Sequence, residues 1–338
     1  MATDLQSRSI YLVVTEVSSL IVFNLLSLIG NTLVCISVYR NTRLRTTTNL
    51  YITSLAISDL LSALFVMPLV IGVLVSGRWI FGEVSCSFQS FIAAFAVYVS
   101  LVTMGLTALN RYVRMCRPEH VYQKLFSAKK SLALLVSVWL FVACYSSLPI
   151  LFGLQKSTFI PGYAICSVSH LSETGKLVHY GIVIPLFLLT PLTITVISYI
   201  KVAKKMQQHK IETSLSRQNS PIISAREMRI SKSLFMVVFV FMICWIPFWI
   251  IALLMRFHLV PRMPRNVKLL CMFFHYLSNT INPLIYAGMN PCFRREFRMT
   301  VCKEKRKVGD HINRVTIQLY SNDVRQEDKG HFGNLSIH

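Results

Sequence analysis

The chain has 338 residues, of which 54% are hydrophobic and only 14% charged, and it carries a net charge of +21. Soluble proteins average about a quarter charged residues, so this composition indicates a membrane protein. Seven apolar stretches reach the length of about 20 residues that a helix needs to cross a bilayer. They cover residues 10–39, 47–75, 84–110, 131–154, 177–200, 233–255 and 268–289.

The lysine and arginine residues predict how these spans are oriented. About three quarters of the 35 lie on one side, in residues 40–49, 111–130, 201–232 and from 290 onward. Cytoplasmic loops carry such an excess, so we expect residues 1–9 to form a short segment outside the cell. The first apolar stretch is expected to be a span rather than a cleavable signal peptide. Topology and anionic lipid explain the basic charge, and we expect no nucleic-acid partner.

Two of the nine cysteines, Cys86 and Cys166, fall on the outer side of the membrane in this topology. Disulfides persist in that oxidising environment. We therefore expect these two cysteines to pair and to tie the third span to the loop before the fifth.

The sequence NPCFRREFRMTV after the seventh span places Phe293, Phe297 and Val301 four residues apart, with arginines on the opposite face. This pattern predicts a cytoplasmic amphipathic helix in the membrane interface. We expect one all-α membrane domain over residues 10–302 and a disordered cytoplasmic tail over 303–338, which has too little apolar content for a core. Cys302 is a candidate acylation site. Hydroxyls that are either kinase sites or simply solvated are Ser214, Ser216, Ser220, Thr316, Ser321 and Ser336.

Asp59, in SLAISDLLSAL, is an ionisable residue deep within the predicted spans. Such residues are costly in a bilayer and are usually functional. A carboxylate with neutral oxygens suits a sodium ion, although Asp59 could instead be a hydrogen-bonded structural link between helices. The candidate ligands are Asp59, Ser100, Ser278, Asn279 and Asn282, with Asn31 at similar depth.

Seven short motifs then occur in order, about one per expected helix. They are GNTLV (30–34), SLAISDLL (54–61), GRWIFGEVSC (77–86), NRY (110–112), Trp139, CWIP (244–247) and NPLIY (282–286). Together they resemble the rhodopsin-like, or class A, G-protein-coupled receptors, over residues 20–298. The resemblance implies a seven-helix plasma-membrane receptor that is not an enzyme and has no cofactor beyond sodium. Its implied partners are a small-molecule ligand, a heterotrimeric G protein, arrestin, receptor kinases and membrane lipid.

The resemblance also implies an activation switch. Arg111 would bridge to Glu227 in the inactive state, and outward movement of helix six would free Arg111 and Tyr112 and open a groove for a partner helix. Asn110 stands where most of the family has an acid, so the bridge to Glu227 is expected to carry more of the restraint. The other switch positions, for which ordinary core packing is the alternative, are Tyr199, Asn282, Pro283, Tyr286, Trp245, Pro247, Phe241, Pro191 and Leu101.

The implied ligand pocket contains no acid. Ala93 stands where amine receptors have an aspartate, and Tyr276 where opsins have the retinal lysine. A buried ammonium without a counter-charge is strongly disfavoured, so we do not expect an amine receptor. A photoreceptor that uses that lysine is excluded. The predicted pocket residues are Ala93, Ala94, Val97, Tyr98, His179, Val183, Phe187, Phe248, Trp249, Met272, His275 and Tyr276.

This aromatic pocket suits a neutral aromatic or lipid-like small molecule. His179 and His275 are either its polar anchors or structural histidines. The NRY variant and the acid-free pocket are similar to the melatonin receptors, but those usually lack the proline of NPLIY, and their helix-six sequence differs from CWIPFWI.

Three other functions are left open by the sequence. A transporter or channel could couple ions through Asp59, but the chain lacks the repeats of transporters. A membrane enzyme has no metal spacing, nucleophile elbow or paired carboxylates to support it. An arrestin-only or scavenger receptor would share the fold, although Arg111, Tyr199 and Tyr286 favour G-protein coupling.

Overall fold

The computed structural model describes residues 5–215, 225–257, 259–260 and 263–301. The chain divides into two compact units, Met1–Arg294 and Arg295–His338. The elements are, in chain order, α1 (Ile10–Arg40), η1 (Thr42–Leu44), α2 (Thr47–Leu61), η2 (Ser62–Val66), α3 (Met67–Ser76), α4 (Gly82–Cys116), α5 (Glu119–Phe126), α6 (Ala128–Leu151), β1 (Gln155–Ile160), η3 (Pro161–Tyr163), β2 (Ile165–His170), α7 (Glu173–Ile182), η4 (Val183–Leu189), α8 (Thr190–Leu215), α9 (Ala225–Arg256), α10 (Arg265–Met289) and α11 (Pro291–Val301).

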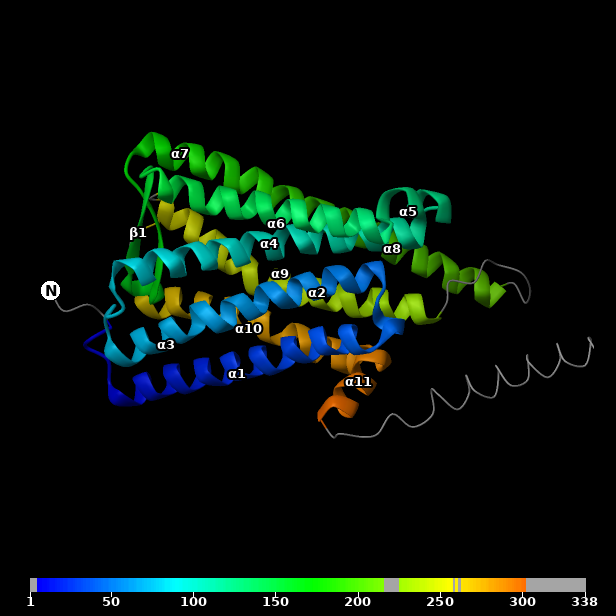
Figure 1. Cartoon of the computed structure of the whole chain (residues 1–338), viewed down its shortest axis with the longest axis horizontal. Helices are drawn as coiled ribbons and strands as arrows, with labels where there is room; N and C mark the ends of the chain where they lie inside the picture. The colour runs from blue at the N-terminus through cyan, green and yellow to red at the C-terminus, as the bar shows by residue number, and fades with distance from the viewer. Residues whose placement is uncertain (1–4, 216–224, 258, 261–262, 302–338) are drawn as a thin grey trace, which may run out of the picture. The chain divides into compact units, whose positions relative to one another are not determined.

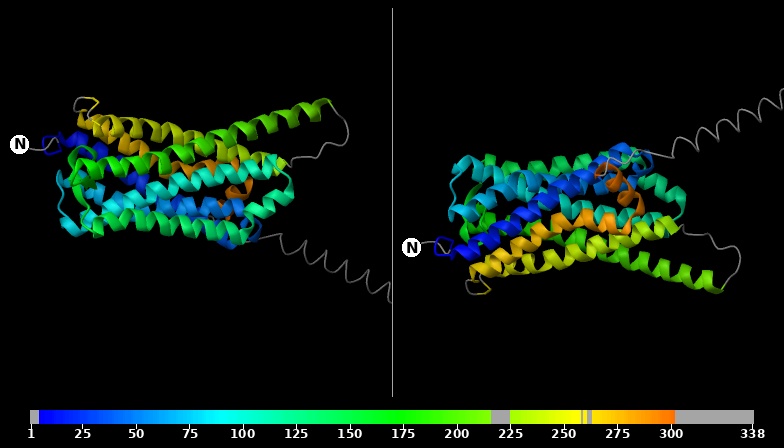
Figure 2. Two further views of the ribbon diagram at one scale, coloured as in Figure 1. Left: turned by 90° about the horizontal axis from the view of Figure 1, so that it is seen from above. Right: turned by 90° about the horizontal axis from the view of Figure 1, so that it is seen from below.

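The long helices of the first unit lie side by side as a bundle (Figures 1 and 2). Six of them are long and apolar enough to cross a membrane. The seventh is α10, whose hydropathy is lowered by Ser278, Asn279, Thr280 and Asn282. The β1–β2 hairpin lies at one end of the bundle and α5 at the other (Figure 1). We call these the hairpin end and the Arg111 end.

Several helices extend beyond the apolar stretches that predicted them, among them α9, which begins at Ala225 instead of residue 233. The third span was expected to end at residue 110, but α4 continues to Cys116. The fifth was expected over residues 177–200, but helix runs from Glu173 to Leu215. Hydropathy marks where the bilayer ends, whereas the polar continuation KVAKKMQQ consists largely of good helix formers. Arg111 therefore lies within a helix, not at its end.

Two pieces of regular structure lie where only loops were expected. Helix α5 packs Tyr122 and Phe126 against Tyr51 of α2. Strands β1 and β2 pair antiparallel, with Phe159 opposite Cys166. The predicted disulfide between Cys86 and Cys166 is confirmed, and it anchors the hairpin to the start of α4.

Glycines allow two close helix contacts. A Cβ added to Gly30 of α1 would lie 2.8 Å from the Cβ of Pro283 in α10. A Cβ added to Gly105 of α4 would lie 3.1 Å from the Cα of Pro191 in α8. Both are shorter than ordinary carbon contacts, so the absence of a side chain lets these helices approach.

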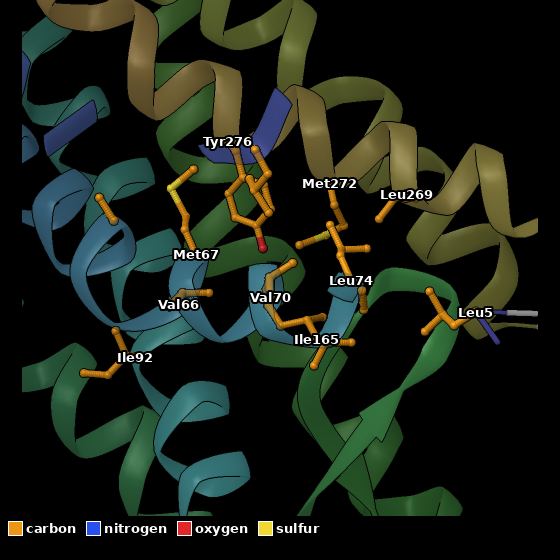
Figure 3. Packing of buried hydrophobic residues seen from close by; sticks show 14 residues of the cluster. Leu5, Val66, Met67, Val70, Leu74, Ile92, Ile165, Leu269, Met272 and Tyr276 are labelled. Atoms are coloured by element: carbon orange, nitrogen blue, oxygen red, sulfur yellow. The ribbon is translucent and has the colours of Figure 1, made fainter. Parts of the chain in front are cut away.

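An apolar cluster near the hairpin end joins Leu5 to six elements, namely α1, η2, α3, α4, β2 and α10. Figure 3 shows Tyr276 pointing from α10 toward Val70 of α3, with Met67 and Leu74 beside it. Leu5, only 2% exposed, belongs to the same cluster. Leu5, in the described part of the N-terminal segment, is therefore packed into the bundle.

The predicted short helix after the seventh span is present as α11. In the first unit its Phe293 is fully buried and stacks on Tyr286, with ring centroids 5.6 Å apart. Residues 295–301 of the second unit are helical. Ser214 lies in the last turn of α8. Outside the described residues lie Cys302, Ser216, Ser220, Thr316, Ser321 and Ser336.

Candidate functional site

Arg111 forms an ion pair between two helices at the Arg111 end. Its Nη1 donates to Oε2 of Glu227 at 2.7 Å, which joins α4 to α9. The Arg111 side chain is 3% exposed and the Glu227 side chain 26%. The sequence placed these two residues opposite each other, and the structure brings them together.

Thr48 of α2 contacts both Arg111 and Asn110, the residue that stands where most of the family has an acid. Its hydroxyl accepts a hydrogen bond from Nη2 of Arg111 and donates to Oδ1 of Asn110 at 2.9 Å. The Asn110 amide in turn donates to the hydroxyl of Tyr122 in α5 at 3.4 Å. A neutral relay therefore replaces the missing acid and connects Arg111 to α5.

Glu227 also lies near a second guanidinium. Nε of Arg114 is 3.7 Å from Oε1 of Glu227, while its Nη1 donates to Glu119 at 2.6 Å. The same guanidinium lies 4.8 Å from the ring centre of Tyr122. Because opposite charges attract over such distances, α9 is held to α4 at two points.

Tyr112 faces cations rather than acids. Nζ of Lys201 in α8 is 5.1 Å from its ring centre, and the guanidinium of Arg117 is 5.7 Å away. Such cation–π contacts contribute about 0.5–1 kcal/mol at exposed sites. Tyr112 therefore links α4 to α8 beside the Arg111 cluster.

Asp59 is buried in the middle of the bundle, where Asn282 of α10 donates to its Oδ2 at 3.0 Å. Three other predicted sodium ligands make contacts elsewhere. Ser100 bonds to Ser58 at 2.9 Å. Ser278 accepts from Nε1 of Trp245 at 2.8 Å, and the backbone oxygen of Asn279 accepts from Asn31 at 3.0 Å. The described structure thus brings Asn282 to Asp59 and leaves the wider ligand set a prediction.

The predicted packing residues of the switch lie in the core between this region and the hairpin end. Phe241 stacks on Trp245 with ring centroids 4.7 Å apart, and Trp245 contacts His275 edge-on at 4.6 Å. Pro191 packs on α4 at Gly105. Tyr199 and Tyr286 are buried and line one small cavity of about 10 Å³. Pro247 and Pro283 lie within the continuous helices α9 and α10, and Leu101 is buried in α4.

A cavity of about 340 Å³ lies at the hairpin end. Ten of the twelve predicted pocket residues line it, namely Ala93, Ala94, Val97, Tyr98, His179, Val183, Phe248, Trp249, Met272 and His275. None of its described lining residues is Asp, Glu, Lys or Arg. The described lining is therefore rich in aromatic side chains, and histidine is its one residue type with an ionisable base.

Phe187 and Tyr276 are absent from the described lining of this cavity. Phe187 lies behind Tyr98, on which it stacks with ring centroids 4.6 Å apart. Tyr276 is fully buried in the apolar cluster of Figure 3. The position of a residue along a helix tells which face it lies on, but not whether it lines a cavity or packs behind the residues that line it.

Part of the cavity wall comes from loops that sequence reasoning missed. Tyr163 of η3 and His170 of β2 line it, together with Ile165, Cys166, Ser167 and Val168. Burial raises the pKa of Tyr163 to about 12, so its hydroxyl stays neutral. The Cys86–Cys166 disulfide was the one sequence signal that this loop would reach the bundle.

Several polar groups around the cavity can orient a ligand. Among the described residues, Nδ1 of His275 and Nε1 of Trp249 are buried without a hydrogen-bond partner. Nδ1 of His179 instead lies 3.1 Å from the hydroxyl of Tyr145 and 3.3 Å from the amide nitrogen of Gln155. Buried polar groups normally have partners, so His275 and Trp249 are the better candidates for ligand contacts.

Comparison with known proteins agrees with this geometry. Residues 30–286 match the family model described as 7 transmembrane receptor (rhodopsin family). The chain belongs to the rhodopsin family of seven-transmembrane receptors. It is thus a multi-pass membrane receptor and not an enzyme.

Relatives and a solved structure extend this family assignment. The chain is 27% identical to the sheep (Ovis aries) melatonin receptor type 1A, over 92% of this chain and 85% of the relative. It is 26% identical to the rat (Rattus norvegicus) neuropeptide FF receptor 1, over 98% and 83%. The crystal structure of squid rhodopsin matches with a TM-score of 0.72 and 25% identity, covering 86% of each chain.

This rhodopsin-family receptor also has a charged cluster that the sequence analysis overlooked. Glu16 of α1 is buried and pairs with both Arg8 and Arg265. Arg8 also donates to the backbone oxygen of Leu74 at 2.6 Å. Glu16 lies within the first predicted span, and acids in spans are usually paired or functional, so the sequence could have indicated this cluster. The cluster ties Arg8, which precedes α1, to α1, α3 and α10.

Proposed function

We propose that this chain binds a neutral aromatic or lipid-like small molecule in the hairpin-end cavity and activates a heterotrimeric G protein. The hairpin end would face the outside of the cell, as the lysine and arginine distribution and the disulfide favour. The observation that carries the proposal is the Arg111–Glu227 pair, which restrains α9 at the opposite end of the bundle from the cavity.

Ligand binding would act through the packed core. His275 lines the cavity and contacts Trp245, which stacks on Phe241 of α9. A ligand that shifts this packing would favour outward movement of α9, because packed interfaces switch between discrete arrangements. Glu227 would then leave Arg111, and a groove for a helix of the partner would open.

The uncharged lining restricts the class of ligand. An ammonium or carboxylate would enter without a counter-charge and lose its hydration. Several relatives are named melatonin receptors, and melatonin is an uncharged indole, so it is the first compound to test. The neuropeptide FF receptor at similar identity shows that resemblance alone does not decide the ligand.

Asp59 is a proposed allosteric sodium site. Its buried carboxylate and the predicted ligand oxygens of Ser100, Ser278 and Asn279 are hard oxygen donors, which fit this cation. Asn282 would hold the carboxylate in place. Arrestin, receptor kinases and membrane lipid are proposed as further partners of the Arg111 end.

The test is nucleotide exchange on a panel of purified G proteins by the receptor in lipid nanodiscs, with and without indoles, lipids and nucleosides. We expect exchange above the empty-nanodisc level and its loss in Arg111→Ala. Arg78→Ala, an exposed arginine at the hairpin end, is the matched control and should behave as the parent. Arrestin recruitment without exchange on any G protein would favour an arrestin-only receptor instead.

A further inference from the structure

Two histidines lie beside each other in the wall of the cavity. His170 ends strand β2 and His179 lies in α7, and their ring centroids are 4.7 Å apart. Both line the cavity. Tyr180 packs against both rings, at 5.7 Å and 5.2 Å. The pair therefore joins the hairpin to the bundle.

The ring of His179 is held in a fixed orientation. The Tyr145 hydroxyl and the Gln155 amide both approach its Nδ1, and the Tyr145 ring stacks on it at 6.0 Å. Gln155 lies opposite His170 in the hairpin register. Histidines that bind metals are oriented in this way, by a partner on the ring nitrogen that does not bind the metal. The metal would bind Nε2, Nδ1–H would donate to the Tyr145 hydroxyl, and the Gln155 amide would turn its oxygen instead of its nitrogen toward Nδ1.

The spacing of the two rings suits one metal ion. Zinc bound by imidazole has bonds of about 2.0–2.1 Å and tetrahedral angles, so its two nitrogens lie about 3.3 Å apart. Ring centroids at 4.7 Å allow two nitrogens to come this close. No Lys or Arg is among the described cavity-lining residues to repel a cation. Imidazole ligands favour zinc over calcium or magnesium.

We propose that His170 and His179 form a two-histidine site for Zn²⁺ in the cavity wall. The described residues contain no group of three or more His, Cys, Asp or Glu that could hold a metal, so water or a donor atom of a bound molecule would fill the remaining two positions. Because the disulfide anchors β2 to α4, the ion would fasten that loop to α7. Binding itself is independent of the proposed function, whereas any effect on ligand exchange rests on it.

The experiment is a Zn²⁺ titration of the full chain in nanodiscs, read by competition with a metal-binding dye and by the thermal unfolding temperature. We expect one saturable site in the micromolar range and a rise in unfolding temperature. His170→Ala and His179→Ala should each weaken binding by about 10-fold or more, and Tyr145→Phe by a similar or smaller factor. His120→Ala, an exposed histidine of α5, is the control and should bind as the parent does.

Two results would overturn the proposal. One is the absence of saturable micromolar binding to the folded parent. The other is unchanged affinity when both histidines are replaced. His170→Gln and His179→Gln serve if an alanine variant fails to fold, since glutamine keeps the size and polarity of the side chain without the imidazole. Nucleotide exchange is not needed for either reading, so failure of the zinc site is distinguishable from failure of the receptor proposal.

Discussion

Replacing Glu227 with glutamine should raise ligand-independent activity, and the structure gives the size of the effect. The substitution keeps the shape of the side chain but removes the charge that faces Arg111 at 2.7 Å. A hydrogen bond between charged groups contributes about 1.5–3 kcal/mol. We take the lower value, about 1.5 kcal/mol, because Glu227 is 26% exposed and therefore partly screened.

A shift of about 1.4 kcal/mol changes an equilibrium constant tenfold. If the active state of the unliganded receptor is a small minority, its population should therefore rise by about a factor of ten in Glu227→Gln. The loss of the Arg114 contact at 3.7 Å acts in the same direction. Because the same bond stabilises the folded inactive state, the unfolding temperature should fall slightly, but by less than for a mutation that opens a cavity in the core.

The assay is nucleotide exchange on the responding G protein without any ligand, at equal amounts of folded receptor. Glu83→Gln, which removes an exposed acid at the hairpin end, is the matched control. A basal rate in Glu227→Gln equal to that of the parent, while Arg111→Ala still abolishes exchange, would refute the idea that this pair restrains α9.

Three further predictions concern single contacts. Thr48→Val should raise basal nucleotide exchange about 2- to 10-fold, because it removes the hydroxyl that bonds to Arg111 and Asn110, a contribution of about 0.5–1.5 kcal/mol. Thr48→Ser keeps the hydroxyl and should leave the basal rate unchanged. Equal basal rates in Thr48→Val and the parent would argue against the relay. Gly30→Ala should destabilise the bundle by about 1–3 kcal/mol through overlap with Pro283, measured by thermal unfolding against Gly181→Ala, which has open space. Sodium should raise the unfolding temperature of the parent but not of Asp59→Asn; an equal rise in both would exclude Asp59 as the site.

The sequence was sufficient for those parts of the fold that depend on the bilayer. Apolar runs predicted seven helices, and the cysteine topology predicted the disulfide between Cys86 and Cys166. It could not predict that helix continues to Leu215 or that α5 forms. Those segments are polar, and their helicity depends on local propensity and on packing of Tyr122 against the bundle.

The candidate site was predictable where one helix face determines it. Ala93 and Val97 line the cavity because they share a face of α4. Tyr276 was misplaced because depth within a face is set by the neighbouring helices, here by Met67 and Val70. His170 was missed because a hairpin's position follows from long-range contacts. Thr48 was missed because nothing in its local sequence shows that it meets Asn110.

The proposed outward movement of α9 is tested most directly by the distance between α9 and α6 at the Arg111 end, measured by double electron–electron resonance. Spin labels at Arg229→Cys and Lys129→Cys, both exposed positions, would be placed in a receptor whose other reactive thiols are replaced. We predict one short distance in the parent, and an added longer-distance population in Glu227→Gln and with nucleotide-free G protein. A single unchanged distance in all three samples would contradict the proposed movement of α9.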